Sequence, residues 1–135
     1  MQSKWRAEMT DMRESGDVSR DRHIPHLPEK GLKLLGFCRR SGKIVCGASQ
    51  VLAAVTGKRP PIVAVIASDA SERTKKQLFD KCSFRDVMLA RADVTGEELA
   101  RLLGKTGAVM AAGATDPAIG AQICRLIRES DDSAK

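Results

Sequence analysis

From residue 29 onward, two kinds of hydrophobic pattern take turns along the chain. The unbroken apolar run at 62–67 is typical of a strand that is covered on both faces. Between the apolar runs, hydrophobic residues recur every three or four positions, which predicts amphipathic helices. Strands are expected at 44–46, 62–67, 87–90 and 108–112. This order predicts an α/β fold, a three-layer α/β/α sandwich with a mixed sheet of about four strands.

The helix that follows the third predicted strand has a clear start signal. Thr95 and Glu98 form the pattern of a capping box, in which each side chain accepts a hydrogen bond from the other residue's backbone N–H. Leu99, Leu102 and Leu103 are then expected to face the core. The sequence therefore predicts both where this helix begins and which face it buries.

The two ends of the chain differ in composition from its middle. Residues 1–28 are polar, mix both signs of charge and close with two prolines, so they are interpreted as a flexible tail or linker. His23 and His26 would supply half of a metal site, but cysteines at ligand spacing are missing, which favours the tail. The folded domain is expected over 29–130, followed by a polar end at 131–135.

Positive charge is concentrated in the first half of the predicted domain. The 135-residue chain has a net charge of +6, and residues 31–85 contain eleven basic but only three acidic side chains. This asymmetry indicates a polyanionic partner, because Lys and Arg facing phosphates release condensed counterions. The alternative at this point is a basic surface that serves only solubility.

Aromatic residues are too few for a surface on which nucleic-acid bases stack. The chain contains three Phe, one Trp and no Tyr, whereas stacking platforms present several exposed aromatic rings. If nucleic acid is the partner, we expect it to be contacted through loops, helix ends and basic side chains.

The sequence indicates a cytoplasmic protein. No apolar run approaches the roughly 20 residues that span a bilayer, and the first residues carry charges throughout, unlike a signal peptide. The cysteines form no C-x-x-C pair and lie among apolar neighbours, so we expect them to be reduced and buried. They are Cys38, Cys46, Cys82 and Cys124.

The residues that enzymes use for catalysis are largely missing. The chain contains no P-loop, G-x-G-x-x-G, H-E-x-x-H or G-x-S-x-G motif. Its two histidines fall in the predicted tail, and Asp69 and Asp116 stand where helix caps are expected. We therefore expect no catalytic activity, no cofactor, no bound metal and no small-molecule substrate.

The segment 39–50 carries the strongest indication of a binding site. Basic residues precede a short strand, and Gly47 then opens a helix, whose amino terminus offers free N–H groups and partial positive charge to a phosphate. The alternative is that Gly47 only makes the turn while the next polar residues cap the helix. The candidate RNA-binding residues here are Arg39, Arg40, Lys43, Gly47, Ser49 and Gln50.

Three motifs together resemble one protein family. They are R-x-G-K-x-x-x-G, A-S-D-A-S-x-x-T-K-K-x-L and A-x-T-D, spread from about Leu32 to Leu126. The chain resembles the YlxQ-type bacterial branch of the kink-turn-binding ribosomal-protein superfamily, named for archaeal L-seven-Ae and L-thirty-e. The resemblance implies an α/β/α sandwich that binds structured RNA, ribosomal or kink-turn-like, and associates with the ribosome.

The resemblance also implies roles for particular residues. In the family, the glycine that opens the second helix precedes a polar pair that reads RNA; Gly47 matches this glycine, and Ser49 and Gln50 match the pair. A basic position before the strand matches Lys43. A loop before the last helix would form a second edge of the interface. That loop is Ala112, Gly113, Ala114 and Thr115, and Arg73 on the helix after the second strand is a further candidate.

The chain departs from the family pattern at three positions. Ser49 is shorter than the usual Asn, Gln50 is neutral where Glu is usual, and Ala53 stands where a Lys is common. Losing a bidentate base contact costs roughly 1–3 kcal/mol of discrimination. The departures therefore bear on kink-turn preference more than on RNA binding in general.

Two other functions remain open at this point. The basic face could bind an acidic partner protein, or the domain could recognise substrates for an RNA-modifying system. The helix that carries Arg73, Lys75 and Lys76 is the alternative place for an RNA interface.

Overall fold

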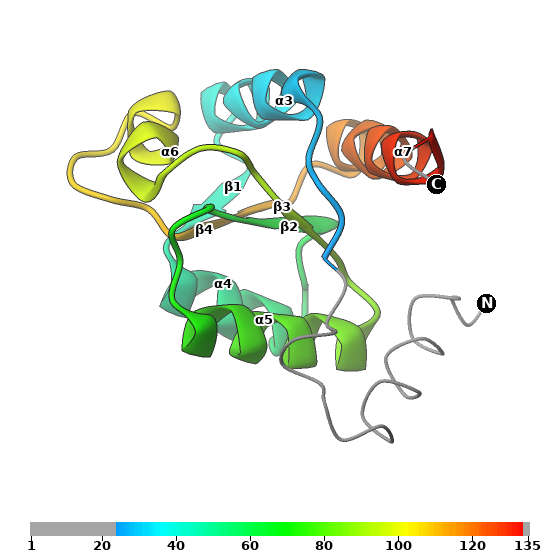
Figure 1. Ribbon diagram of the computed structural model, residues 1–135, viewed down its shortest axis with the longest axis horizontal. Coiled ribbons are helices and arrows are strands. Elements are labelled where there is room, and N and C mark those ends of the chain that lie inside the picture. The colour runs from blue at the N-terminus through cyan, green and yellow to red at the C-terminus, as the bar shows by residue number, and fades with distance from the viewer. Residues whose placement is uncertain (1–23, 134–135) are drawn as a thin grey trace.

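The computed structural model describes residues 24–133 and shows helices and strands in the predicted alternation (Figure 1). Helices α3, α6 and α7 cover one face of the sheet, and α4 and α5 cover the other. The predicted α/β/α sandwich is therefore confirmed. The elements are α3 (Glu29–Arg40), β1 (Ile44–Cys46), α4 (Ala48–Val55), β2 (Val63–Ile66), α5 (Glu72–Arg85), β3 (Met88–Arg91), α6 (Gly96–Leu102), β4 (Ala111–Ala114) and α7 (Pro117–Ser133).

The four strands form one mixed sheet in the order β1-β4-β2-β3. Strand β4 runs antiparallel to both β1 and β2, and β2 runs parallel to β3. Strands β1, β2 and β3 therefore share one direction and end at the same edge of the sheet. Helices α4, α5 and α6 begin there, and we call this the carboxyl edge. In open α/β sheets, ligands bind outside the carboxyl ends of the strands.

The sheet is buried on both faces because successive side chains of each strand point to opposite sides. Val63 and Val65 pack beneath α3, α6 and α7, whereas Ala64 and Ile66 pack against α4 and α5. Burying a side chain of this kind stabilises the fold by about 1.5–3 kcal/mol. The apolar run at 62–67 thus folds as the double-covered strand that it predicts.

The last strand lies further along the chain than the sequence pattern indicates. Strand β4 occupies Ala111–Ala114 and is fully buried, so the expected strand at 108–112 and the loop at 112–115 are both wrong in position. A run of Ala and Gly has low β-propensity and reads as a loop. Small side chains are needed here, since a Cβ on Gly113 would lie 3.1 Å from Pro61 Cβ.

The start of the domain also differs from the prediction. Leu27 is buried, its N–H donates to the Arg91 carbonyl at 2.8 Å, and the Arg91 N–H donates to the Pro25 carbonyl at 2.7 Å. Residues 24–28 are therefore part of the domain, paired with the outer edge of β3, and the predicted tail is wrong for them. The rest of that tail, His23 included, lies outside the described residues.

Two smaller corrections concern helices. Leu102 is 39% exposed, whereas Leu99 and Leu103 are buried as predicted. Helix α7 continues to Ser133, into the polar end expected at 131–135. Within residues 24–133, no helix is both long and apolar enough to cross a membrane.

Candidate nucleic-acid interface

The turn between β1 and α4 requires glycine. Gly47 adopts φ 103° and ψ 140°, a conformation that residues with a Cβ rarely adopt. A Cβ there would also lie 2.5 Å from the side-chain oxygen Oε1 of Gln50. The Gly47 N–H donates to the Ala111 carbonyl at 2.8 Å, which fixes the turn to the start of β4.

The first turn of α4 is left uncapped. No side chain among residues 24–133 accepts a hydrogen bond from its N-terminal N–H groups, and its N-cap is Gly47. The Ser49 hydroxyl instead donates to Gln50 Oε1 at 3.2 Å, and both residues are exposed. Ser49 and Gln50 thus do not cap the helix, so the purely structural interpretation of these two residues is not observed. The first turn keeps free N–H donors and partial positive charge.

Helix α6 begins at the same edge and is closed by three acceptors. The Thr95 hydroxyl accepts from the Glu98 N–H at 3.2 Å, and Glu98 Oε1 accepts from the Thr95 N–H at 2.8 Å. Asp69, from the loop after β2, accepts from the Gly96 N–H at 2.8 Å. The predicted capping box is confirmed. Asp69 caps a helix as well, but this helix is α6 and not α5, which directly follows it in the chain.

Helices α5 and α7 are also capped. The Ser71 hydroxyl accepts from the Thr74 N–H at 3.2 Å at the start of α5. Asp116 accepts from the N–H groups of Ala118 and Ile119 at 2.9 and 3.0 Å at the start of α7, as predicted. Of the three helices that begin at the carboxyl edge, only α4 therefore presents an amino terminus without a side-chain cap.

The loop between α6 and β4 brings a second positive group to this edge. Lys105 lies close enough to Cys46, at the end of β1, for its charge to act on that thiol. Gly104 and Gly107, on either side of Lys105, adopt φ values of 70° and 75°. Sequence reasoning missed Lys105, although a lysine between two glycines before the last strand was a visible signal.

Arg39 lies against this loop. Its guanidinium covers Gly104, so that a Cβ there would lie 2.6 Å from Arg39 Cζ. Arg39 thus links the end of α3 to the residue that precedes Lys105.

The remaining predicted residues do not form one group. Lys43 and Gly47 stand at opposite ends of β1, about 13 Å apart at about 3.3 Å per residue. Thr115 lies beside Lys43, since its N–H donates to the Lys43 carbonyl at 3.0 Å. Arg40 places its guanidinium 5.5 Å from the centre of the Phe37 ring. These three candidates lie away from the start of α4.

Arg73 lies in the first turn of α5, which begins at the carboxyl edge beside α4. It is exposed and has no ion-pair partner within the described part of the chain. By contrast, Lys75 pairs with Glu72 at 3.5 Å and Lys76 with Asp80 at 3.2 Å. Arg73 is thus an exposed basic residue in the first turn of a helix that begins at the same edge as α4.

Ala112, Gly113 and Ala114 are enclosed between the helical layers. Because these residues of β4 are buried, they present no surface to a ligand. We therefore do not place them in the interface. The geometry brings Gly47, Ser49, Gln50, Arg73 and Lys105 to the carboxyl edge.

The four cysteines are free thiols, and three of them are buried; Cys46 is half-buried. Burial raises the pKa of Cys82 to about 12. It also raises the pKa of Cys46, although the positive charge of Lys105 offsets part of this shift. These thiols stay protonated at neutral pH. No cluster of residues within 24–133 has the composition to hold a metal ion.

Comparison with known proteins places the chain in a family. The ribosomal protein L7Ae/L30e/S12e/Gadd45 family matches residues 29–121, most of the described domain. The chain belongs to this family, which confirms the resemblance seen in its motifs.

Two relatives indicate which branch of the family the chain resembles. The RNA-binding protein YlxQ of Enterococcus faecium is 35% identical over 71 residues, covering 50% of this chain and 68% of that protein. The RNA-binding protein YlxQ of Bacillus subtilis is 30% identical over 94 residues, covering 70% and 91%. These relatives are named as RNA-binding proteins and not as enzymes, in agreement with the expectation that this chain has no catalytic activity.

Solved structures share the fold. A Bacillus halodurans protein of unknown function superposes with a TM-score of 0.66 at 29% identity, covering 75% of this chain and 99% of that one. The Giardia lamblia 15.5kD RNA binding protein superposes with a TM-score of 0.65 at 18% identity, covering 83% and 97%. The second likeness bears on the fold alone.

Proposed function

We propose that this chain binds structured RNA, ribosomal or kink-turn-like, at the carboxyl edge of its sheet. The observation that carries the proposal is the uncapped start of α4 at an edge where α5 and α6 begin with side-chain caps. Membership of the family and the two relatives named as RNA-binding proteins support RNA as the partner.

The start of α4 is suited to a phosphate oxygen. Its free N–H groups and the helix dipole favour an anion. Glycine at position 47 adds no side chain of its own to the turn, and the exposed Gln50 side chain that lies over it can move aside for an RNA backbone. Lys105 and Arg73 add two full positive charges from neighbouring elements. The RNA backbone would thereby contact the start of α4, the first turn of α5 and the loop between α6 and β4.

Ser49 and Gln50 supply the groups that read bases. Both side chains are exposed, and they are hydrogen-bonded to one another at 3.2 Å, so each can exchange that bond for one to a base edge. A hydroxyl and an amide offer donors and acceptors alike. This pair would recognise unpaired or bulged nucleotides, whose edges are accessible, in preference to a regular duplex. A kink-turn or a similar bulged element of ribosomal RNA, in the cytoplasm, fits this requirement.

The experiment compares three labelled RNAs by fluorescence anisotropy. They are a kink-turn, a plain duplex and an unstructured single strand, each titrated at about 50 and about 200 mM salt. We expect the kink-turn to bind most tightly and its advantage to persist at the higher salt, because base contacts do not depend on counterion release. Equal affinity for all three RNAs, falling steeply with salt, would leave only an electrostatic role. No binding at low salt would refute the proposal.

A further inference from the structure

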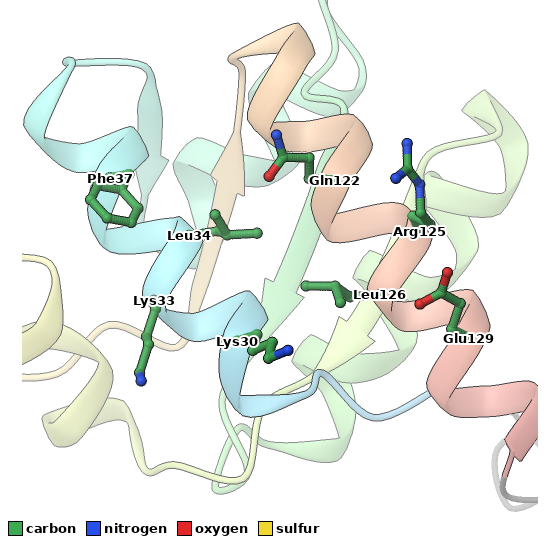
Figure 2. A pocket seen from close by; sticks show the side chains of 8 residues that line it. All are labelled: Lys30, Lys33, Leu34, Phe37, Gln122, Arg125, Leu126 and Glu129. Atoms are coloured by element: carbon green, nitrogen blue, oxygen red, sulfur yellow. The ribbon is translucent and has the colours of Figure 1, made fainter.

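A groove of about 560 Å³ is lined by α3 and α7 (Figure 2). Both helices lie on the face of the sheet opposite α4 and α5 (Figure 1). Its α3 side is a single stripe formed by Lys30, Lys33, Leu34 and Phe37, which recur every three or four residues. Phe37, one of three phenylalanines in the chain, is 49% exposed and not buried in the core. An exposed aromatic side chain of this size in a groove marks a contact surface for another molecule.

The α7 side repeats the same spacing. Gln122, Arg125, Leu126 and Glu129 form one stripe along this helix, and Leu126 points across the groove towards Leu34 (Figure 2). Each stripe covers two helical turns, about 10 Å at about 1.5 Å per residue. The groove therefore has an apolar floor and a length suited to the apolar face of one more helix.

Charge determines which kind of helix fits. The groove is lined by three cations, Lys30, Lys33 and Arg125, against one carboxylate. None of these three cations has an ion-pair partner among residues 24–130. A helix with carboxylates beside its apolar face would pair with them while its apolar residues cover the floor.

RNA fits this groove less well. Only one aromatic residue lines it, so stacked bases would lack a platform, and an apolar floor offers nothing to phosphates. The groove also lies across the sheet from the start of α4. Two different partners can therefore be bound on the two faces at the same time.

We propose that the groove between α3 and α7 binds an acidic amphipathic helix of a partner protein. The test uses a fluorescein-labelled synthetic helix of about 14 residues, about four turns, with leucines every three or four positions and glutamates elsewhere. A second peptide carries lysines in place of the glutamates. We expect the full chain to bind the glutamate peptide at least about tenfold more tightly than the lysine peptide.

Variants in the groove are compared with matched variants on the opposite face. Phe37→Ala and Lys33→Glu are each expected to weaken the glutamate peptide at least about tenfold. Phe84→Ala and Lys81→Glu remove the same groups from α5, where Phe84 is 78% exposed. These two variants are expected to change the affinity for the glutamate peptide by less than about twofold. Circular dichroism establishes that each variant is folded. RNA affinity is expected to stay within about twofold for the two groove variants.

Four results would overturn the proposal. Equal binding of the two peptides, or unchanged binding by Phe37→Ala, would mean that the groove does not select an acidic helix. A large loss of RNA affinity in Lys33→Glu would assign the groove to RNA. Displacement of the glutamate peptide by an equal concentration of a peptide of residues 1–23 would assign the groove to the chain's own amino-terminal segment.

Discussion

Helices α4 and α6 both begin at the carboxyl edge, on opposite faces of the sheet, and their first turns are built in opposite ways. Helix α6 is closed by Thr95, Glu98 and Asp69, three acceptors from two loops. Helix α4 begins at Gly47 and receives no side-chain acceptor from residues 24–133. Replacing a polar N-cap residue by alanine costs about 1 kcal/mol, but replacing it by glycine costs only a few tenths, so Gly47 leaves the start of α4 open at little cost in stability.

The difference indicates that the start of α6 serves stability, whereas the start of α4 is open to a ligand. At α6 the acceptors belong to the protein, and they tie the loop after β2 to the loop after β3. At α4 the acceptor has to come from outside, from water or from a ligand. Helix α4 has only eight residues, so it depends on the packing of Val51 and Val55 more than on its own first turn. This dependence lets the turn stay open without loss of the helix.

The largest effect is expected when the open turn is closed by a carboxylate. Gly47→Asp places a negative charge at the proposed phosphate site and forces a side chain into the φ 103° conformation. We expect RNA affinity to fall at least about thirtyfold, about 2 kcal/mol. The strain should also cost on the order of 1–3 kcal/mol of stability. Anisotropy titrations at a temperature where circular dichroism shows a folded variant separate the two effects.

Gly42 provides the matched control for this variant. It also has positive φ, 76°, but stands at the other end of β1, where an added Cβ would meet nothing within 4 Å. Gly42→Asp makes the same change of charge in a conformation that Asp tolerates. We expect it to lower RNA affinity by less than about threefold. An equal loss in both variants would move the interface to the segment 39–43.

A smaller and different effect is expected at the closed helix start. Thr95→Ala removes the hydroxyl that accepts from the Glu98 N–H, and should lower the free energy of unfolding by about 1 kcal/mol. Urea denaturation measures this loss. RNA affinity should stay within about twofold, because this turn contributes only to stability. If RNA affinity falls with the helix cap, the two helix starts do not divide their roles as proposed.

The contrast between the two starts was only half visible in the sequence. The capping box is a local pattern, because Thr95 and Glu98 are three residues apart, and it was predicted. The third acceptor of α6, Asp69, comes from a residue 27 positions earlier in the chain, so no local pattern assigns it to α6. Gly47 was identified because it opens a helix whose amino terminus suits a phosphate, and because it matches a glycine in the family pattern. That its turn stays uncapped depends on rotamers that the sequence does not reveal.

The predicted site was incomplete for the same reason. Residues 39–50 are contiguous in sequence, yet β1 separates Lys43 from Gly47 and sends them to opposite edges of the sheet. The group that does accompany Gly47, Lys105, is far away in sequence and arrives through an antiparallel neighbour strand. Strand β4 itself was misplaced because its Ala-Gly sequence lacks the β-branched residues that identify a strand.

Lys105→Ala tests whether this distant residue takes part. Removing one charge that faces a phosphate should weaken RNA binding about threefold to fivefold and lower the slope of log affinity against log salt by about one. Titrations at four salt concentrations determine that slope. Lys58→Ala, an exposed lysine that follows the other end of α4, is the control and should leave the slope unchanged. Equal slopes for Lys105→Ala and the unaltered chain would remove the loop after α6 from the interface.

The smallest effect is expected from Gln50→Glu, which addresses RNA shape. A carboxylate at this position accepts hydrogen bonds from guanine edges, but repels phosphates. We expect affinity for a plain duplex to fall about twofold to threefold, whereas affinity for a kink-turn is kept, so that the preference for the kink-turn rises. The same anisotropy titrations with both RNAs give this ratio.

Gln50→Ala separates the reading of a base from simple repulsion. It removes the amide without adding charge, so it should lower kink-turn affinity while leaving duplex affinity almost unchanged. If Gln50→Glu weakens both RNAs equally and Gln50→Ala weakens neither, position 50 faces the RNA backbone and no base. The open start of α4 would then hold RNA by its phosphates alone, and its shape preference would have to come from Ser49 or from the loop that carries Lys105.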